Sequence, residues 1–310
     1  MTGQDNIIEL RGVDKSFEDT RALEGIDLSI SNGEFLTLLG PSGCGKTTIL
    51  RILSGFETPD QGDVSIGGQR MNDVPPERRQ VNTVFQNYAL FPHMTVRDNV
   101  AFGLRMQSCP KGEIEGRVLE ALRMVHLEQY ADRRPHQLSG GMRQRVMIAM
   151  ALCCNPAMLI CDEPTTALDV TIQAQILDLI NELKEKTGTS VMMMTHDLGV
   201  IAEVADDVMV MYAGKVVEHA SCDQIFDKPM HPYTDGLMKC IPKLDDDDTK
   251  ELSVIKGMVP SFDDMPAGCA FCPRCPQARE ICRQKMPELV EAEGRMVRCF
   301  KYTKEWEENI

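Results

Sequence analysis

A glycine-rich segment near residue 40 carries the strongest chemical signal in the chain. Gly40-Pro-Ser-Gly-Cys-Gly-Lys46-Thr47 matches the pattern G-x-x-x-x-G-K-[ST] of phosphate-binding loops. Glycines let backbone N–H groups turn inward around a phosphate, and the helix that follows adds the positive end of its dipole. In this pattern Lys46 reaches the β- and γ-phosphates of a nucleotide, and the Thr47 hydroxyl binds Mg²⁺. Cys44 needs only its small size to fit such a loop.

Two adjacent carboxylates follow an apolar run further along the chain, in Met158-Leu-Ile-Cys-Asp162-Glu163. Asp162 would hold Mg²⁺, directly or through water, and Glu163 would act as the general base on the attacking water. Such a pair is weak evidence by itself, because acidic residues often begin loops. The phosphate loop upstream makes a nucleotide-hydrolysing site the better interpretation.

The cysteines form a second group of residues that could do chemistry. Five of the 12 lie between Cys269 and Cys299, whereas seven are scattered from Cys44 to Cys240, mostly in apolar stretches. The scattered ones are expected to be small buried hydrophobes. Clustered cysteines in a reducing compartment favour a metal site over disulfides, but spacing alone does not select one metal.

Composition limits the class of protein. The 310 residues include 33 basic and 47 acidic side chains, a formal charge of −14, which argues against coating nucleic acid. The 43 % hydrophobic and 26 % charged residues are typical of a globular protein. No apolar run approaches the roughly 20 residues of a membrane span, and the first residues lack a signal-peptide pattern. We expect a soluble protein of the reducing cytoplasm.

Alternating strands and helices must position these residues. Apolar runs predict strands buried on both faces, and the alternation of Ile26, Leu28 and Ile30 predicts a half-exposed strand. The expected elements are buried strands over 35–39, 157–161 and 190–194, helices over 47–53, 143–152 and 171–187, and a hairpin over 208–217. This order implies an α/β fold with a largely parallel sheet.

An acidic run at residues 245–248 marks a boundary, because like charges repel and stay solvated. We expect a main domain over residues 1–235 and a small cysteine-bearing C-terminal extension over residues 236–310.

One further segment points to a family. Leu138-Ser139-Gly140-Gly141-Met142 resembles the signature of the ATP-binding subunits of ABC (ATP-binding cassette) transporters, and the resemblance covers most of residues 7–230. Other matching positions follow in the family's order: the adenine-stacking aromatic Phe17, the glutamine Gln86, the cross-dimer loop Ala167-Leu168-Asp169 and the switch histidine His196. Met142 departs from the glutamine that many members carry, but Ser-Gly-Gly is intact.

The resemblance implies a P-loop NTPase fold with a RecA-like core, an N-terminal antiparallel β subdomain and a helical signature subdomain at about residues 88–152. It implies Glu163, His196 and Gln86 as catalytic residues, and Mg²⁺ held by Thr47, Gln86 and Asp162. The implied ATP-binding residues are Phe17, Gly40, Pro41, Ser42, Gly43, Cys44, Gly45, Lys46, Thr47, Thr48, Gln86 and Asp162, with Ser139, Gly140, Gly141 and Asp169 acting from the partner chain of a head-to-tail dimer.

The two parts of the chain resemble different branches of this family. Residues 1 to about 137 look like the ATPase of a spermidine/putrescine importer, and residues from about 136 to 310 look like that of a dipeptide/oligopeptide importer. The chain therefore reads as a natural or engineered recombinant, and looser packing is expected where the helix over 143–152 meets the helical subdomain. In the tail, Cys269, Cys275, Cys282 and Cys299 resemble the ligands of a [4Fe–4S] cluster, with Cys272 as an additional thiol; zinc and unmetallated thiols stay open.

The implied function is the ATP-hydrolysing subunit of an ABC importer, with peptides and polyamines nearly equal as substrates. Its implied partners are two membrane permease subunits, a second ATPase subunit (identical or paralogous) and, indirectly, an extracytoplasmic solute-binding protein, with no nucleic acid. We expect it on the cytoplasmic face of the inner membrane. A soluble ABC ATPase of translation or DNA repair is the alternative, and a nucleotide-sensing regulator is disfavoured because Glu163 is present.

Overall fold

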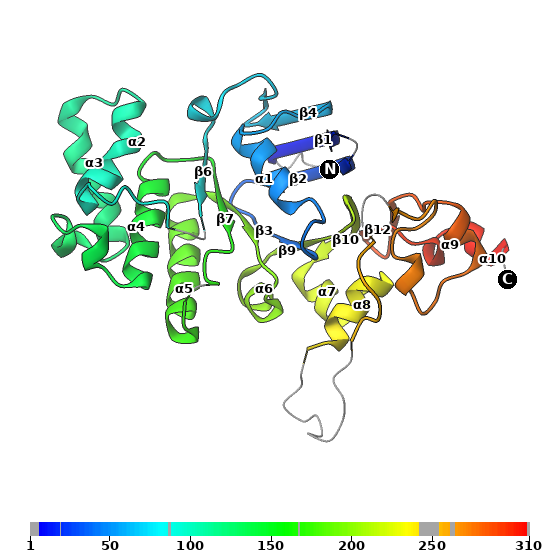
Figure 1. Ribbon diagram of the computed structural model, residues 1–310. Coiled ribbons are helices and arrows are strands. Elements are labelled where there is room, and N and C mark those ends of the chain that lie inside the picture. The colour runs from blue at the N-terminus through cyan, green and yellow to red at the C-terminus, as the bar shows by residue number, and fades with distance from the viewer. Residues whose placement is uncertain are drawn as a thin grey trace.

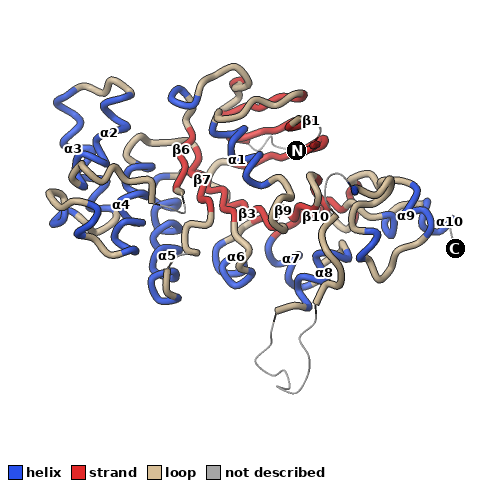
Figure 2. The backbone as a smooth tube through the Cα atoms, viewed as in Figure 1, coloured by secondary structure: helices blue, strands red, loops and turns tan. Residues whose placement is uncertain are grey.

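A twisted eight-stranded sheet forms the centre of the molecule (Figures 1 and 2). The computed structural model describes residues 6–18, 20–85, 88–166, 168–241, 254–260 and 264–308. The sheet has the order β11-β12-β10-β9-β3-β8-β7-β6. Its strands are β3 (Phe35–Leu39), β6 (Val81–Val84), β7 (Met158–Asp162), β8 (Ser190–Met194), β9 (Asp207–Tyr212), β10 (Lys215–Ser221), β11 (Val290–Ala292) and β12 (Arg295–Val297).

The five strands from β6 to β9 in this order are parallel, and every residue of β3 and β8 is buried. Full burial is expected of parallel strands that are covered on both faces. The predicted strands over 35–39 and 190–194 are confirmed, and the third lies one residue later than predicted, over 158–162. The predicted hairpin is the antiparallel pair β9 and β10.

A second, antiparallel sheet lies beside the first and has the order β2-β1-β4-β5. Its strands are β1 (Asn6–Phe17), β2 (Thr20–Ser31), β4 (Gln61–Ile66) and β5 (Gln69–Arg70). Along β2, Ile26, Leu28 and Ile30 are buried while Glu24 and the residues between them are more exposed, as their alternation predicts. These side chains share one apolar core with helix α1 (Lys46–Ser54), which follows the phosphate loop.

Helices α2 (Val96–Met106), α3 (Lys111–Met124) and α4 (Gly140–Leu152) gather at the end of the molecule opposite the C-terminus (Figure 1). The remaining helices are α5 (Val170–Thr187), α6 (Leu198–Val204), α7 (Cys222–Asp227), α8 (Pro232–Lys239), α9 (Glu280–Gln284) and α10 (Glu305–Glu308). Among the described residues no helix is long and apolar enough to cross a bilayer.

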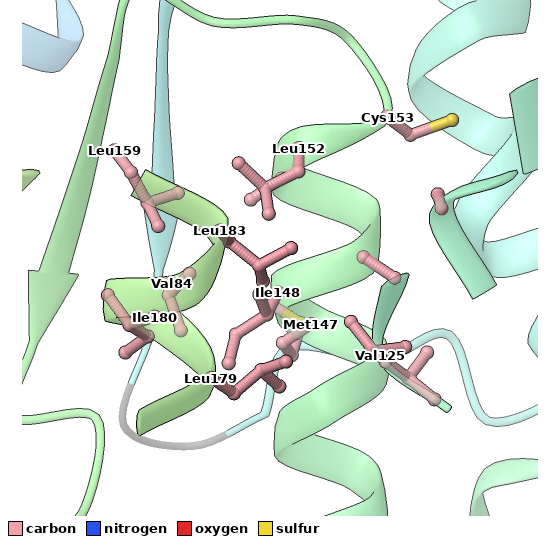
Figure 3. Packing of buried hydrophobic residues seen from close by; sticks show 14 of the residues in the cluster. Val84, Val125, Met147, Ile148, Leu152, Cys153, Leu159, Leu179, Ile180 and Leu183 are labelled. Carbon is pink, nitrogen blue, oxygen red and sulfur yellow. The ribbon is translucent and has the colours of Figure 1, made fainter. Parts of the chain in front are cut away.

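The apolar side chains of α4 are buried in one cluster with those of the neighbouring helices. Met147, Ile148 and Leu152 of α4 meet side chains of α5 in a single buried cluster that also includes residues of α2 and α3 (Figure 3). Two polar side chains at the start of α4 differ: within the described part of the chain, Nε of Arg143 and both amide atoms of Gln144 are buried without a hydrogen-bond partner. The region around α4 therefore combines a buried apolar cluster with unpaired polar atoms.

The C-terminal extension continues the central sheet. β12 pairs with β10 through Glu218 opposite Val297 and His219 opposite Met296, and β11 adds the last strand. Arg298 donates to the carbonyl oxygen of Val216, which fastens the extension to β10, and to that of Pro287 within the extension. The extension is therefore joined to the main domain by backbone pairing as well as by side chains.

Candidate functional site

The phosphate loop connects the buried strand β3 to helix α1. The Lys46 ammonium donates hydrogen bonds to the carbonyl oxygens of Gly40 at 2.6 Å and Pro41 at 3.1 Å, and Nζ lies 3.7 Å from the Cys44 sulfur. These bonds hold the charge inside the curve of the loop, at the N-terminus of α1. The loop thus places a cation and a helix dipole side by side, which is the arrangement that binds phosphate.

Two of the loop glycines are required by close approach of the chain. A β-carbon at Gly40 would stand 2.4 Å from the Met211 carbonyl oxygen, and one at Gly45 would stand 2.5 Å from a methyl carbon of Leu23. Gly45 also has a φ of 107°, a conformation that favours glycine. The shape of the loop therefore depends on contacts with β9 and β2 as well as on its own sequence.

The carboxylates Asp162 and Glu163 lie at the carboxyl end of β7, on the same edge of the sheet as the phosphate loop. Burial, together with the neighbouring Glu163 carboxylate, raises the pKa of Asp162, and the Lys46 charge opposes that shift. A carboxylate near a cation and a threonine hydroxyl supplies the oxygen ligands that Mg²⁺ prefers. The donor set of Asp162 and Thr47 fits this ion.

Glu163 is held from three sides. Its Oε1 lies 3.2 Å from Nδ1 of His196, its Oε2 accepts from the Thr166 hydroxyl at 3.1 Å, and its N–H donates to the Met194 carbonyl oxygen. The backbone of Glu163 has a φ of 47°, which is uncommon for a residue with a side chain. Such strained positions cluster at functional sites. The contacts orient a carboxylate and a histidine 33 residues apart toward each other.

Most of the predicted ATP residues line one pocket of about 380 Å³. Phe17 stands at its rim with 39 % of its surface exposed, and the Lys15 ammonium lies 5.3 Å from the ring centre. The predicted residues on the pocket wall are Phe17, Ser42, Gly43, Gly45, Lys46, Thr47, Thr48, Asp162 and Glu163. Gly40, Pro41 and Cys44 belong to the loop but not to the pocket wall.

The residues predicted to act on the partner chain's nucleotide lie apart from this pocket. Ser139, Gly140 and Gly141 of the signature and Asp169 of the cross-dimer loop do not line it. The α4 helix begins three residues earlier than predicted, at Gly140, because Ser139 caps it by accepting from the Met142 N–H. Asp169 caps α5 in the same way, through the N–H of Ile172. A β-carbon at Gly141 would stand 2.6 Å from Cγ2 of Ile172, so glycine is also needed within the chain.

Gln86, predicted to act at the site, and Ala167, in the loop predicted to cross to the partner chain, lie outside the described residues. Sequence reasoning missed Thr166 and Met194, which contact Glu163, and Thr20 and Ala22, which line the pocket. Only Thr166 carried a local signal, since a hydroxyl three residues after an acid can reach its carboxylate.

The five tail cysteines surround a common cavity, which Phe271 also lines. Burial raises the pKa of Cys269 to about 12 and that of Cys299 to about 11, with neighbouring thiols adding to the shift. The Cys269 N–H donates to the Cys282 carbonyl oxygen at 2.8 Å, which brings the two ends of the cluster together. No three or more His, Cys, Asp or Glu side chains in the described ranges are arranged to hold a metal ion.

Sequence families match two parts of the chain. The family described as "ABC transporter" matches residues 23–166, and "Oligopeptide/dipeptide transporter, C-terminal region" matches residues 217–282. The first match includes the phosphate loop and both carboxylates. The second begins in β10 and reaches into the cysteine cluster.

Relatives come from both importer branches. The spermidine/putrescine import ATP-binding protein PotA of Nitratidesulfovibrio vulgaris is 59 % identical over 233 residues, 75 % of this chain and 63 % of PotA. The oligopeptide transport ATP-binding protein AppD of Bacillus subtilis is 44 % identical over 306 residues, 93 % of each chain. The chain thus spans less than two thirds of that PotA but nearly all of AppD.

Solved structures share the fold. CbiO1 of Clostridium perfringens, part of the ABC transporter complex CbiONQ, aligns with a TM-score of 0.67 and 31 % identity, covering 72 % of this chain and 92 % of that one. The ATP-binding cassette MJ0796, in a dimeric post-hydrolysis state bound to ADP and phosphate, aligns with a TM-score of 0.61 and 33 % identity, covering 69 % of this chain and 98 % of that one. The expected ABC ATPase fold is confirmed.

Proposed function

The chain belongs to the ATP-binding proteins of ABC transporters, and from this premise we propose that it hydrolyses ATP to drive solute import through separate membrane permeases. The single observation that carries the proposal is the pocket that unites Lys46, Thr47, Asp162 and Glu163. These four side chains supply the cation, the metal ligands and the base that phosphoryl transfer to water needs.

Each side chain has a proposed role that follows from its place. Lys46 neutralises charge on the transferred phosphate, while Thr47 and Asp162 hold Mg²⁺, which balances the charge of the nucleotide when bound. Glu163 accepts a proton from the attacking water, and His196, 3.2 Å away, keeps its carboxylate oriented. Phe17 at the rim offers a flat apolar face to the adenine base. Gln86 is proposed as a third contact to Mg²⁺.

We also propose the head-to-tail dimer. Ser139, Gly140, Gly141 and Asp169 lie outside the pocket of their own chain, and MJ0796 is a dimer bound to ADP and phosphate in its solved structure. In the proposed dimer the N-terminus of α4 faces the γ-phosphate in the partner's pocket, where its dipole favours the negative charge. ATP then joins the two chains and hydrolysis releases them.

Two substrate classes are proposed, each on its own observation. The 59 % identity to PotA favours polyamines, and the matched oligopeptide/dipeptide C-terminal region together with AppD, aligned over 93 % of the chain, favours peptides. Purifying the chain with its membrane permeases tests the choice. Polyamine-stimulated ATP hydrolysis by that complex selects the first class, and peptide-stimulated hydrolysis selects the second.

The proposed partners are two membrane permeases and a second ATPase subunit, with a solute-binding protein acting on the far side of the membrane. The chain would lie at the cytoplasmic face of the inner membrane, and its divisions would be the ATP-binding domain, residues 1–235, and the extension, residues 236–310. The comparisons give no support to the alternative of a translation or DNA-repair ATPase.

The tail is proposed to bind a [4Fe–4S] cluster through Cys269, Cys275, Cys282 and Cys299. Five thiols around one cavity fit an iron–sulfur group by donor chemistry. Zinc is the alternative, because thiolate sulfurs from the same residues are also the donors of tetrahedral zinc sites. Brown protein with stoichiometric iron and sulfide would support the cluster, and colourless protein containing zinc would remove it.

The ATPase proposal has a direct test. Purified wild-type chain should bind ATP and release phosphate only when Mg²⁺ is present, and Lys46→Ala should lose about 100-fold in phosphate release. A matched control is Lys15→Ala, which removes a lysine near the pocket rim that is paired with Glu57 and Asp60. Equal loss in both variants would contradict the role of Lys46.

A further inference from the structure

The back of the phosphate loop rests on the end of β9. A β-carbon at Gly40 would stand 2.4 Å from the Met211 carbonyl oxygen, which shows how closely the two backbones approach. Three residues further on, the Gly214 N–H donates to the Cys44 carbonyl oxygen at 3.1 Å. Between these two contact points lies Tyr212, with no exposed surface. Tyr212 is therefore flanked on both sides by residues that contact the phosphate loop.

The ring of Tyr212 is enclosed by aromatic side chains from the C-terminal part of the chain. Phe271 meets it edge-on with ring centres 5.4 Å apart, and Tyr233 of α8 lies at 4.8 Å. Phe271 and Tyr233 are themselves 5.5 Å apart. All three rings are at most 3 % exposed. Aromatic groups at these separations attract each other beyond the burial of their area.

These contacts come from the loop that carries the cysteines. Phe271 lies between Cys269 and Cys272, and Arg274 lies between Cys272 and Cys275. Arg274 donates to the Tyr212 hydroxyl at 3.2 Å and also to the carbonyl oxygens of Lys256 and Ile255. The loop over 269–275 thus holds the side chain of Tyr212 by a ring contact and by a hydrogen bond.

The same buried cluster includes Leu39, the residue that immediately precedes the phosphate loop. Leu39, Tyr212, Tyr233 and Phe271 thus belong to one buried cluster that extends from the cysteine loop to the base of the phosphate loop. Close-packed interiors transmit displacement, because a side chain cannot move without moving its neighbours. Tyr212 gives a shift of Phe271 a packed route toward the phosphate loop.

We propose that Phe271 is a positioning residue for nucleotide binding: through Tyr212, the cysteine loop of the extension sets the geometry of the phosphate loop and thereby its affinity for ATP. This deepens the proposed function and rests on it for the nucleotide itself. The proposal gives the extension a task at the ATP site, and it holds whatever group the cysteines bind.

The test compares Phe271→Ala with Phe300→Ala in the full chain. Phe300 is an equally buried phenylalanine of the same extension and lines the same cysteine cavity, but it is absent from the buried cluster that contains Phe271, Tyr212 and Leu39. Phe271→Ala should raise the Kd for ATP roughly tenfold, because small misplacements of a binding loop are costly, with turnover at saturating ATP within about twofold. Phe300→Ala should change Kd by less than about twofold.

A second readout needs no nucleotide. The Cys44 thiol is buried inside the phosphate loop, so its alkylation by N-ethylmaleimide, followed by mass spectrometry of its peptide, reports opening of the loop. Phe271→Ala should speed this reaction roughly tenfold and Phe300→Ala should not. If wild-type chain binds no ATP, the proposed function fails, while the alkylation rates still decide the positioning role.

The outcomes separate clearly. Equal effects of both variants on Kd and on alkylation would show general destabilisation and overturn the proposal, as would an unchanged Kd and alkylation rate in Phe271→Ala. If Phe271→Ala does not fold, Phe271→Leu retains most of the volume and should give a smaller change, about threefold, in the same two measurements.

Discussion

The nucleotide pocket and the cysteine cavity both consist of side chains that can bind ligands or react, but the two sites are built in opposite ways. The pocket gathers charged side chains near the carboxyl ends of parallel strands, and its wall includes Glu163, which contacts His196, and the partly exposed Phe17. The cavity gathers thiols from short helices and loops, with Cys272 and Cys282 buried and the pKa of Cys269 raised by burial.

The difference indicates what each region requires from a ligand. Lys46 already donates to loop carbonyl oxygens, so the pocket is shaped before a nucleotide binds. The thiols must lose protons before they can bind a metal, and their raised pKa values oppose that loss until the metal supplies its charge. We therefore expect the pocket to keep its shape without a nucleotide, whereas the cysteine loop should need its bound metal to stay ordered.

The largest effect is expected when Glu163, the proposed general base, is replaced. Glu163→Gln should lower the turnover number about 1,000-fold, because the amide cannot accept the proton of water, while ATP binding is retained and a closed dimer accumulates. Phosphate release and size-exclusion chromatography with Mg²⁺ and ATP measure these outcomes. Thr166→Val serves as the control, since it removes only the hydroxyl that contacts Glu163. Turnover near the wild-type rate in Glu163→Gln would refute the base assignment.

Gly141 of the signature distinguishes packing within one chain from contact with the partner chain's nucleotide. Gly141→Ala should lower turnover about 100-fold, either because the new methyl group meets Ile172 within the chain or because it meets the partner's nucleotide. Gly141→Ala combined with Ile172→Ala removes the internal contact alone. The dimer proposal predicts that the double variant stays inactive in the phosphate-release assay. Recovery of activity would assign the glycine to packing within its own chain.

The tail should respond differently. Cys282→Ser should remove most of the bound iron and sulfide, since a serine hydroxyl is a poor ligand for iron, and should change turnover at saturating ATP by less than about twofold. Iron and sulfide analysis together with the absorption spectrum measure the first effect. The control is Cys153→Ser, a buried thiol of the main domain. Equal metal content in both variants would contradict the proposed ligand set.

The smallest effect concerns stability. Burial and the Glu163 carboxylate raise the pKa of Asp162, so its charged form is disfavoured in the folded protein. The free energy of unfolding therefore falls as pH rises above the pKa that Asp162 has in the unfolded chain. Asp162→Asn should therefore raise the free energy of unfolding at neutral pH by less than about 1 kcal/mol after solvent screening, which thermal unfolding shows as a slightly higher midpoint temperature. The gain should shrink as pH falls below the unfolded value. A gain that persists at low pH would show another cause.

The pocket was largely predictable because its signals are local in the chain. A glycine loop after a buried strand and an acidic pair after another must meet, since the carboxyl ends of parallel strands share one edge of the sheet. The contact of His196 with Glu163 needed the family resemblance, because a single histidine after a strand has no distinguishing pattern.

The attachment of the tail could not be predicted in the same way. The pairing of β12 with β10 joins residues about 80 positions apart through strands of three and seven residues, and nothing in such short segments specifies a partner. The packing of Phe271 on Tyr212 likewise depends on the final fold. Sequence reasoning found the thiols but not the contacts that connect their loop to the phosphate loop.

The most direct test of the account is ATP hydrolysis by the chain reconstituted with its membrane permeases in proteoliposomes, with and without solute and its binding protein. Solute should increase phosphate release by the wild-type complex, and the Glu163→Gln complex should release almost none. Phosphate release that is the same with or without the permeases and their solute would contradict the assignment to an importer.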